Sequence, residues 1–411
     1  MGNAQRKIKL AIIGCGGRGK SLIRLMMDLE KFDIVAVCDH YEDKAEDAAK
    51  KVVEFGGEKP LVYTDYIKLY DEVKPEAVYV ATSWETHVRV SIDALKRGVA
   101  VAMEVGGAHN FEELEELVEV YEQTKTPFMF MENCCFGKDE LLATSLVRNN
   151  KFGEIVYCHG AYRHDLREEV ASGDVNRHYR LNHYLNRNCE NYPTHELGPI
   201  AKIIGINRGN RMVSLVSRSS KAAGMKAYVA ENDKYAHLRD KEFKQGDVFE
   251  TLITCENGEM VSLKLDTTLP FYYSREFTVR GTKGGYNQDC NCVVLSGEED
   301  GIPSAEARVK FFNNADKYKE YLPEIWQNPG RMVDLGHGGM DAFLFQSFAD
   351  CYLNGKEMPL DVYDAAAWMA ITYLSEKSVL ENRVVEVPDF TKGAYKNRPI
   401  KDVVEFPVIE K

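Results

Sequence analysis

Short apolar runs alternate with amphipathic segments over the first third of the chain. The apolar runs have the length of strands buried on both faces, and they are residues 8–13, 34–38, 77–81, 99–103 and 128–131. Segments between them carry apolar residues at helical spacing, as in residues 20–29, 88–97 and 111–124. Repeated β-α-β units with right-handed crossovers form an open parallel sheet. The pattern therefore predicts an α/β fold with a doubly wound parallel sheet in residues 1–136.

A glycine-rich turn follows the first apolar run. Gly14, Gly16 and Gly19 fit the pattern G-x-G-x-x-G, and Gly17 lies between them. Glycines at these positions permit a tight turn and let the backbone approach a pyrophosphate at the start of the next helix. A strand, this turn, a helix, a second strand and an acid in register predict a Rossmann dinucleotide-binding domain.

The acid is Asp39, which ends the second apolar run 20 residues after Gly19. Its carboxylate can accept hydrogen bonds from both ribose hydroxyls and would repel a 2′-phosphate, so we expect NAD rather than NADP. Arg18 could serve the pyrophosphate or the ribose. Ligands bind at the carboxyl ends of the strands in such sheets, so topology alone places several later polar residues beside the cofactor. These residues are Trp84, His87, Glu104 and Asn133.

The pattern changes after about residue 136. Strands with alternating polar positions and long loops replace the β-α-β units, which indicates an open, mostly antiparallel sheet. Two long helices are predicted near the end of the chain, over residues 336–354 and 361–380. We therefore expect an α+β domain over residues 137–411.

Histidines and tyrosines gather in the first part of this second domain. Five of the ten histidines and five tyrosines lie between residues 157 and 195. These side chains supply acids, bases and surfaces that stack on sugars, whereas a metal site would show a tighter ligand spacing. A helix is predicted over residues 197–204, with Tyr192 and His195 three residues apart near its start, where they could project into one pocket. A helix N-terminus favours a neutral imidazole, which can act as a base.

The net charge argues against some classes of function, and the cysteine content indicates the cellular compartment. The 52 basic and 64 acidic residues give a net charge of −12, which argues against binding of nucleic acid or of an anionic membrane surface. The apolar runs are far too short to span a bilayer. Ten scattered cysteines are typical of free thiols in a reducing compartment, so we expect a cytoplasmic protein. Cys290 and Cys292 lack the second half of a zinc motif, and no metal is expected.

The whole chain resembles the Gfo/Idh/MocA oxidoreductase superfamily, and within it glycoside hydrolase family 109, the NAD-dependent α-N-acetylgalactosaminidases. The resemblance extends from Gly14 to the segment at residues 361–368. Its most specific parts are residues 162–167, 192–195, 270–274 and 281–284. Residues 104–106 depart from the wider superfamily, because Glu-Val-Gly stands where dehydrogenases usually carry Glu-Lys-Pro.

The resemblance implies roles for individual residues. Residues expected to line NAD are Gly17, Arg18, Asp39, Trp84 to His87, Glu104, Val105 and Asn133. Residues expected to line the sugar are Tyr162, Arg180, Tyr192, Pro193, Thr194, His195 and Tyr273. Candidate catalytic residues are Tyr192 and His195 for proton transfer, Tyr162 and Tyr273 for leaving-group or C2 chemistry, and Glu132. The resemblance also implies a homo-oligomer, because the open sheet commonly pairs in the superfamily.

The implied chemistry is hydrolysis of N-acetylgalactosaminides through transient oxidation at C3, C1–C2 elimination, addition of water and re-reduction, with recycled NAD. Two alternatives stay open. One is a sugar or cyclitol dehydrogenase with net redox turnover, which the missing lysine disfavours. The other is a non-enzymatic sensor, which the cluster of histidines and tyrosines disfavours.

Overall fold

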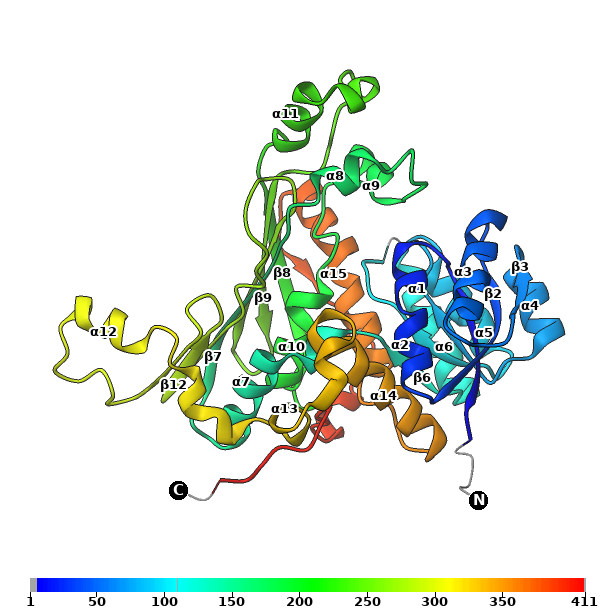
Figure 1. The fold of residues 1–411 in the computed structure, drawn as a ribbon. Coiled ribbons are helices and arrows are strands. Elements are labelled where there is room, and N and C mark those ends of the chain that lie inside the picture. Colours follow the sequence, from blue (N-terminus) through cyan, green and yellow to red (C-terminus); the bar gives the residue numbers. More distant parts are fainter. Residues whose placement is uncertain (1–5, 109, 410–411) are drawn as a thin grey trace. The chain divides into compact units, whose positions relative to one another are not determined.

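The computed structural model describes residues 6–108 and 110–409. The chain forms two compact units (Figure 1). The first unit extends to Phe136 and also contains Pro329–Ala366, and the second comprises Gly137–Asn328 and the chain from Ala367 onward. The break after Phe136 falls where the sequence pattern changes. The return of Pro329–Ala366 to the first unit leaves no sign in that pattern.

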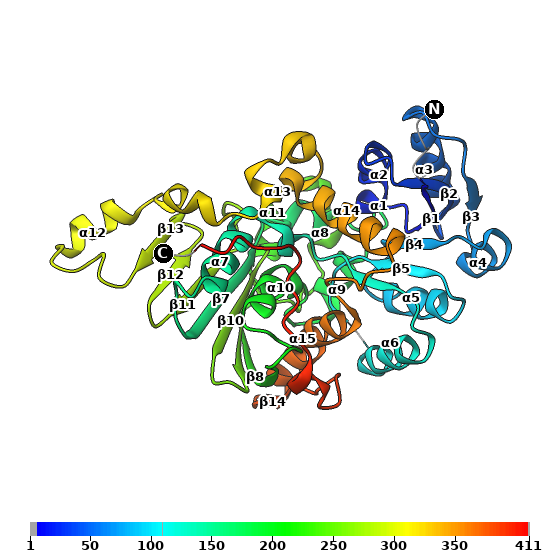
Figure 2. The same cartoon turned by 90° about the horizontal axis from the view of Figure 1, so that it is seen from below.

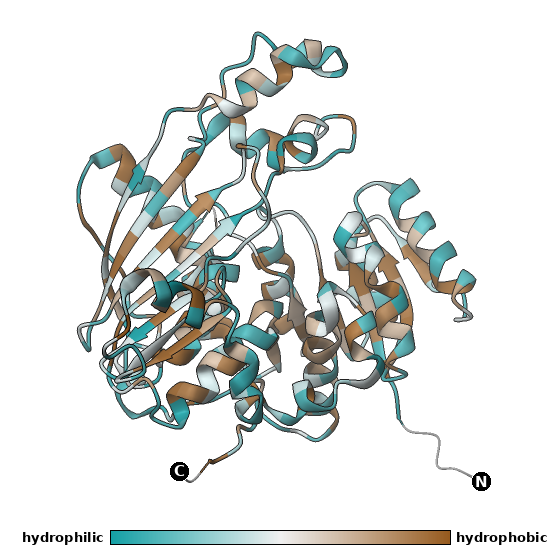
Figure 3. Ribbon diagram, turned by 60° about the vertical axis from the view of Figure 1, so that its left-hand side comes forward, coloured by the Kyte–Doolittle hydropathy of each residue, from teal (hydrophilic) through white to brown (hydrophobic). Residues whose placement is uncertain are grey.

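The first unit contains the expected parallel sheet, with six strands in the order β3-β2-β1-β4-β5-β6. Its strands are β1 (Ile8–Ile13), β2 (Phe32–Cys38), β3 (Leu61–Tyr63), β4 (Ala77–Val80), β5 (Ala100–Met103) and β6 (Phe128–Phe130). The hydropathy colouring shows apolar strands inside and polar outer helix faces (Figure 3). The strand order switches between β1 and β4, with β2 and β3 on one side and β5 and β6 on the other, and such switch points are where these sheets bind ligands.

Helices connect these strands. They are α1 (Gly17–Ser21), α2 (Ile23–Asp28), α3 (Glu42–Glu54), α4 (Tyr66–Val73), α5 (His87–Leu95) and α6 (Phe111–Thr124). The single helix predicted over residues 20–29 is wrong in two respects, because it begins at Gly17 and breaks at Leu22. A Cβ on Gly19 would lie 2.0 Å from the Gly14 carbonyl oxygen, so the helix starts inside the glycine motif, packed against the turn.

The returning segment packs on the parallel sheet through aromatic side chains of α14 (Met340–Leu353). The Phe345 ring centroid lies 6.1 Å from that of Phe32 on β2 and 5.1 Å from that of Tyr79 on β4. Phe348 stacks on Phe32 at 6.4 Å. This apolar contact explains why a segment so late in the chain belongs to the first unit. The helix predicted from residue 336 begins at Met340, because left-handed backbone at Gly338 and Gly339 interrupts it.

The second unit is built on an eight-stranded sheet with the order β13-β12-β11-β7-β10-β9-β8-β14 (Figure 2). Its strands are β7 (Ile155–Arg163), β8 (Met212–Ser219), β9 (Val248–Cys255), β10 (Met260–Asp266), β11 (Thr278–Gly281), β12 (Gly284–Asn287), β13 (Cys292–Leu295) and β14 (Val385–Glu386). Only the pairing of β7 with β10 is parallel among these strands, so the expected mostly antiparallel sheet is confirmed.

Helices of the second unit cover one part of this sheet and flank its ends (Figure 1). They are α7 (Lys138–Arg148), α8 (Arg167–Ala171), α9 (Arg180–Asn186), α10 (Thr194–Ile203), α11 (Gly224–Glu231), α12 (Ser304–Phe311) and α13 (Glu324–Gln327). Helix α15 (Val362–Glu381) begins in the first unit and continues in the second. Within the described residues, no helix has the length and apolar character needed to span a bilayer.

Part of the eight-stranded sheet carries exposed apolar side chains. Val156 on β7, Leu252 on β9 and Met260 on β10 are between 42% and 51% exposed. Along β9, buried and exposed positions alternate, as expected for a sheet with one open face. Pairing of this face between copies of the chain stays a prediction.

Helix α10 lies against β7 at Gly160, where a Cβ would come within 2.8 Å of the Glu196 carbonyl oxygen. Backbone atoms cannot move aside cheaply, so we expect Gly160→Ala to lower the free energy of unfolding by about 1–3 kcal/mol. Urea unfolding followed by circular dichroism measures this loss. Val156→Ala, at an exposed position of the same strand, is the control and should cost less than about 1 kcal/mol. Equal losses in the two variants would contradict close packing at Gly160.

Candidate functional site

The glycine turn of the first unit has the geometry of a phosphate cradle. Gly14 has φ +93°, and a Cβ there would lie 2.4 Å from the Ala81 carbonyl carbon, so only glycine fits. By contrast, a Cβ on Gly16 or Gly17 would meet no atom of the described residues within 4 Å. The backbone is therefore tightly packed beneath the turn and open above it, which is the arrangement that close approach of a pyrophosphate needs.

Asp39 is held in place at the end of β2. Its carboxylate accepts hydrogen bonds from the backbone N–H groups of Cys15 at 2.8 Å and Tyr41 at 2.9 Å. The Cys15 contact ties the acid to the glycine turn itself. Asp39 is partly exposed, so its carboxylate can also accept hydrogen bonds from ribose hydroxyls.

Residues after β4 and β5 form a second wall of this cradle. Gly106 has φ +155°, and a Cβ there would lie 2.2 Å from the Trp84 indole, so the backbone beside Val105 packs directly on that ring. His87 is fully buried, and neither of its ring nitrogens has a hydrogen-bond partner among the described residues. Burial lowers the pKa of His87 to about 4, so the ring is neutral. The buried Thr82 hydroxyl likewise has no partner within the described chain.

These unpartnered polar atoms and the open space above the glycines fit a bound dinucleotide. The predicted cofactor residues follow β1, β2, β4, β5 and β6, which are neighbours in the sheet. The backbone of the glycine turn would hold the pyrophosphate, and Asp39 would bind the ribose. The residues after β4 and β5 would contact the rest of the cofactor.

The Arg18 side chain joins two carboxylates that are far apart in the sequence. Its Nε donates to Glu104 at 2.8 Å, while Nη1 and Nη2 donate to the two oxygens of Asp341 at 3.0 and 2.8 Å. Burial alone would lower the pKa of Arg18, but Glu104 and Asp341 raise it well above its ordinary value. The guanidinium therefore supports the cradle as a permanent cation.

Further hydrogen bonds extend this network along the sheet. Tyr79 on β4 donates to Glu104 at 2.6 Å, and the Asn133 amide after β6 donates to Asp341 at 2.8 Å. Burial would raise the pKa of Asp341, but hydrogen bonds from His337 and the guanidinium hold it well below its usual range. Sequence reasoning missed Tyr79, Asp341 and His337, because a buried tyrosine and a returning segment carry no motif.

Glu132, a candidate catalytic residue by resemblance, lies directly after β6 in the first unit and is fully buried. One of its carboxylate oxygens accepts the Cys134 backbone N–H at 3.0 Å. Its catalytic role stays a prediction.

In the second unit, four predicted site residues converge into one cluster of rings, the aromatic cluster: Tyr162, Tyr192, His195 and Tyr273. Ring centroids are 4.7 Å apart for Tyr162 and Tyr192, and 4.8 Å apart for Tyr192 and His195. Tyr162 also lies 5.7 Å from His195 and 6.3 Å from Tyr273. Burial raises the pKa of Tyr162 far above its ordinary value, so its hydroxyl stays protonated.

The turn between Tyr192 and His195 leads straight into α10. The predicted helix start at residue 197 is wrong, because α10 begins at Thr194 with Pro193 as its N-cap. Proline is favoured at such a start because its φ, here −71°, already suits a helix. Thr194 is fully buried, so this turn faces the interior of the second unit.

Two polar groups complete the cluster. The His164 Nδ1 lies 3.1 Å from the Tyr162 hydroxyl, and burial together with Arg180 lowers the pKa of His164. The Arg180 guanidinium, paired with Glu169, lies 5.2 Å from the centre of the Tyr192 ring. His164 belongs to the histidine-rich segment, although its place in the site was not predicted.

A buried ion pair lies behind Tyr273. Arg275 donates two hydrogen bonds, at 2.9 and 2.6 Å, to one oxygen of the Glu140 carboxylate. Its Nη1 donates to the Tyr273 hydroxyl at 3.2 Å. No local sequence pattern predicts this pair, since the two partners are 135 residues apart.

The other histidines of the segment lie elsewhere. His159 pairs with Glu276 at 3.0 Å, and His178 stacks on Tyr179 with ring centroids 4.5 Å apart. His183 lies on α9 with its ring edge toward Tyr179. Their proximity in sequence is therefore only partly a proximity in space.

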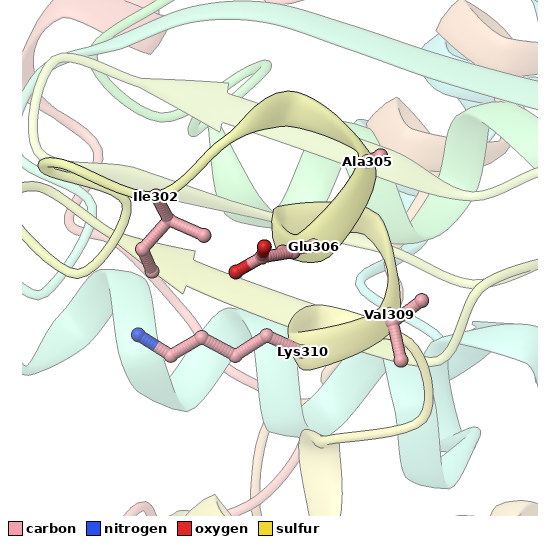
Figure 4. Close-up of a pocket in the computed structure, with 5 residues that line it drawn as sticks. All are labelled: Ile302, Ala305, Glu306, Val309 and Lys310. Atoms are coloured by element: carbon pink, nitrogen blue, oxygen red, sulfur yellow. The ribbon is translucent and has the colours of Figure 1, made fainter.

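A hollow of about 540 Å³ lies along α12 (Figure 4). It is lined by Ile302, Ala305, Glu306, Val309 and Lys310. This lining is aliphatic apart from one carboxylate and one ammonium, and it contains none of the rings described above. We assign no chemistry to it.

Comparison with known proteins covers both units. Residues 136–397 match the family model described as glycosyl hydrolase 109, C-terminal domain. Residues 8–131 match the model of an oxidoreductase family with an NAD-binding Rossmann fold.

Individual relatives match almost end to end. The chain is 35% identical to a glycosyl hydrolase family 109 protein of Stenotrophomonas maltophilia, over 96% of this chain and 91% of the relative. It is 33% identical to an alpha-N-acetylgalactosaminidase of Tannerella forsythia, over 97% and 89%. An oxidoreductase from Agrobacterium radiobacter, solved with NAD⁺, L-tartaric acid and magnesium, superposes with a TM-score of 0.65 over 93% of this chain and 99% of that one. Its 18% identity supports the fold alone.

Arg18→Ala would leave the Glu104 and Asp341 carboxylates without their guanidinium. We expect it to lower the free energy of unfolding by about 3 kcal/mol, since removal of one partner leaves buried charge uncompensated. The matched control is Arg24→Ala, whose exposed pair with Asp28 should contribute less than about 1 kcal/mol. Urea unfolding of both variants measures the difference. A loss at Arg18 no larger than at Arg24 would show that the network does not support the cradle.

Proposed function

The chain belongs to glycosyl hydrolase family 109, and from this premise we propose that it hydrolyses terminal N-acetylgalactosaminides, most favourably the α anomers, with a recycled NAD. The NAD-binding domain and the glycoside hydrolase domain account for nearly the whole chain. The sugar is proposed from the name of the Tannerella forsythia relative, an alpha-N-acetylgalactosaminidase.

The observation that carries the proposal is the aromatic cluster, which lies within the part of the chain that matches the family 109 domain. Its rings offer faces on which a sugar can stack and hydroxyl and imidazole groups that can move protons. Hydrolysis by this route needs a base for the C3 hydroxyl, a base for the C2 proton and an acid for the leaving group.

Bound NAD would accept a hydride from C3 of the sugar and return it at the end, so that no net redox change occurs. The C3 ketone acidifies the C2 proton, and removal of that proton expels the C1 substituent. Water would then add its hydroxyl to C1 of the resulting C1=C2 double bond, and its remaining proton would restore the acid that protonated the leaving group. The protons taken from the C3 hydroxyl and from C2 are returned, so the net reaction is hydrolysis.

We assign these proton transfers to Tyr192 and His195. The ring centroids are 4.8 Å apart, so one sugar can meet both side chains and exchange protons with each. The Arg180 cation near the Tyr192 ring would stabilise negative charge as Tyr192 gives up a proton. Tyr162 stays protonated and donates a hydrogen bond that orients the sugar.

Tyr273 is the better candidate for the leaving-group acid. Its hydroxyl accepts a hydrogen bond from Arg275, and such a bond stabilises the phenolate that remains after proton donation. Glu140 fixes the guanidinium from behind. Tyr273 is also 47% exposed, whereas Tyr162 is 6% exposed, so Tyr273 can reach an aglycone that extends into solvent.

Purified protein with no added nicotinamide should release the aryl group steadily from an aryl N-acetyl-α-galactosaminide, without accumulation of NADH, because the cofactor is recycled. Aryl release and reduced-nicotinamide absorbance are followed together. Tyr192→Phe and His195→Ala should each lower turnover by about 10²–10⁴-fold with NAD still bound. Tyr157→Phe, earlier on β7, is the control.

Two results would contradict the proposal. Absence of aryl release, with NADH build-up on free sugars and NAD, would indicate a dehydrogenase. Near-normal turnover in both Tyr192→Phe and His195→Ala would show that these two residues do not carry the proton transfers.

The acid role predicts a dependence on the leaving group. Tyr273→Phe and Arg275→Met should lower kcat about 100-fold for an alkyl glycoside, which needs protonation, but only a few-fold for a nitrophenyl glycoside, which does not. Arg280→Met, at an exposed position on β11, is the control for removal of an arginine. Steady-state kinetics with both substrates measure the ratio. An equal loss on both substrates would assign Tyr273 to another step.

A further inference from the structure

Two buried acids, Glu190 and Glu196, flank the turn that carries Tyr192 and His195. They are 0% and 1% exposed. Neither Glu190 carboxyl oxygen, nor Oε1 of Glu196, has a hydrogen-bond partner of ordinary geometry among the described residues. Oε2 of Glu196 accepts the Lys264 backbone N–H at 3.0 Å. Ionised carboxylates would be strongly disfavoured here, because both water and counter-charge are missing.

The two acids compensate for each other. Their carboxyl groups are within hydrogen-bonding reach of each other. A proton on one acid can therefore be donated to an oxygen of the other. Burial raises the pKa of Glu190 to about 8, and burial together with the Glu190 charge raises that of Glu196 well above its ordinary value. Burial therefore favours the protonated form of this pair.

Charged groups around the pair are already engaged with one another. On the sheet, Glu276 binds the Lys264 ammonium at 2.9 Å, Arg163 at 2.6 Å and His159 at 3.0 Å. On α15, Glu376 is paired with Arg187. The α15 groups that contact the Glu190 backbone are the hydroxyls of Ser375 and Thr372, which carry no charge. Protons, rather than cations, must therefore neutralise the pair.

Both ends of the turn are anchored through these acids. The Glu190 N–H donates to the Ser375 hydroxyl at 2.9 Å, and its carbonyl accepts the Thr372 hydroxyl at 2.7 Å. The Glu196 backbone rests on Gly160 of β7. The Tyr192 backbone N–H faces the Glu190 carboxyl. A link between the two carboxyl groups thus closes the loop that bears both rings.

We propose that Glu190 and Glu196 are positioning residues, whose proton-mediated contact closes the Tyr192–His195 turn and holds these two rings in their relative orientation. The consequence for turnover rests on the proposed function, whereas the contact itself does not.

Folding should take up protons at this pair. An acid whose pKa is raised in the folded state contributes stability that is complete below its unfolded pKa of about 4.3 and is lost as pH rises to about 8. Each such proton raises the unfolding constant about tenfold per pH unit in this window. The slope of the unfolding free energy against pH, measured by urea unfolding between pH 5.5 and 7.5, gives the number of protons taken up on folding. Glu190→Gln and Glu196→Gln should each lower this number by about one. Glu250→Gln, at an exposed position on β9, should change nothing. If both buried variants keep the wild-type slope of unfolding free energy against pH, the proposed proton-mediated contact between Glu190 and Glu196 is wrong.

Positioning is tested without substrate by NMR of ¹³C-labelled histidine, with His195→Asn to assign the His195 signal. Glu196→Ala should shift this signal, and Glu196→Gln, whose amide can replace the carboxyl proton, should restore it. With the aryl glycoside, Glu196→Ala should lower kcat at least about tenfold with little change in KM, and Glu196→Gln should recover most of that loss.

The outcomes separate the two proposals. If no variant releases aryl but the His195 signal follows the predicted pattern, the proposed function fails and the positioning stands. If the wild type hydrolyses the glycoside, while Glu196→Ala keeps both the wild-type His195 signal and full kcat, the positioning fails and the function stands.

Discussion

The first unit depends on one cation, the Arg18 guanidinium, because it neutralises two carboxylates that the fold would otherwise bury without compensation. Glu104 follows β5, and Asp341 lies in the first turn of α14, the helix that returns to the parallel sheet. Tyr79 and Asn133 bind the same carboxylates, so the ends of β4, β5 and β6 are connected to the glycine turn through hydrogen bonds to charged groups. Such bonds are stronger than neutral ones, and the cradle therefore keeps its shape through charge as much as through glycine geometry. Arg18 consequently has its guanidinium committed to the protein, which leaves the turn's backbone as the means of holding phosphate.

The second unit handles buried charge in two ways. Glu140 meets Arg275 in a direct ion pair, and the pair points a guanidinium N–H at Tyr273. Glu190 and Glu196 have no such cation in the described part of the chain, and in our proposal protons on the carboxyl groups take its place. The first arrangement places positive charge beside the Tyr273 hydroxyl. In our proposal, the second arrangement holds the turn without introducing charge beside Tyr192 and His195, whose own charges would change during proton transfer.

Local pattern predicted the parts of the site that depend on short-range geometry. The glycines, Asp39 and the residues after each strand could be placed because parallel strands bring their carboxyl ends to one edge. Tyr192 and His195 could be paired because three residues separate them at a helix start. Partners such as Asp341 and Arg18, 323 residues apart, or Arg275 and Glu140, 135 apart, could not be found this way. No periodicity records such contacts. The histidine-rich segment shows the converse error, because only His164 and His195 of its five histidines join the aromatic cluster, while His159 pairs with Glu276.

At residue 105 this chain differs from the dehydrogenases of the superfamily that it resembles. Those dehydrogenases usually carry a lysine there, which helps to move a proton to or from the substrate hydroxyl. Val105 is 6% exposed and apolar, and its neighbour Glu104 is bound by Arg18 and Tyr79. Neither side chain can therefore relay that proton. In the proposed function, protons would instead move through side chains that can both donate and accept, and the tyrosines and the histidine of the aromatic cluster are such side chains. In the proposed hydrolysis, a C2 proton as well as a hydroxyl proton must be removed, so several such groups would be needed, and they would take over the part that the lysine has in the dehydrogenases.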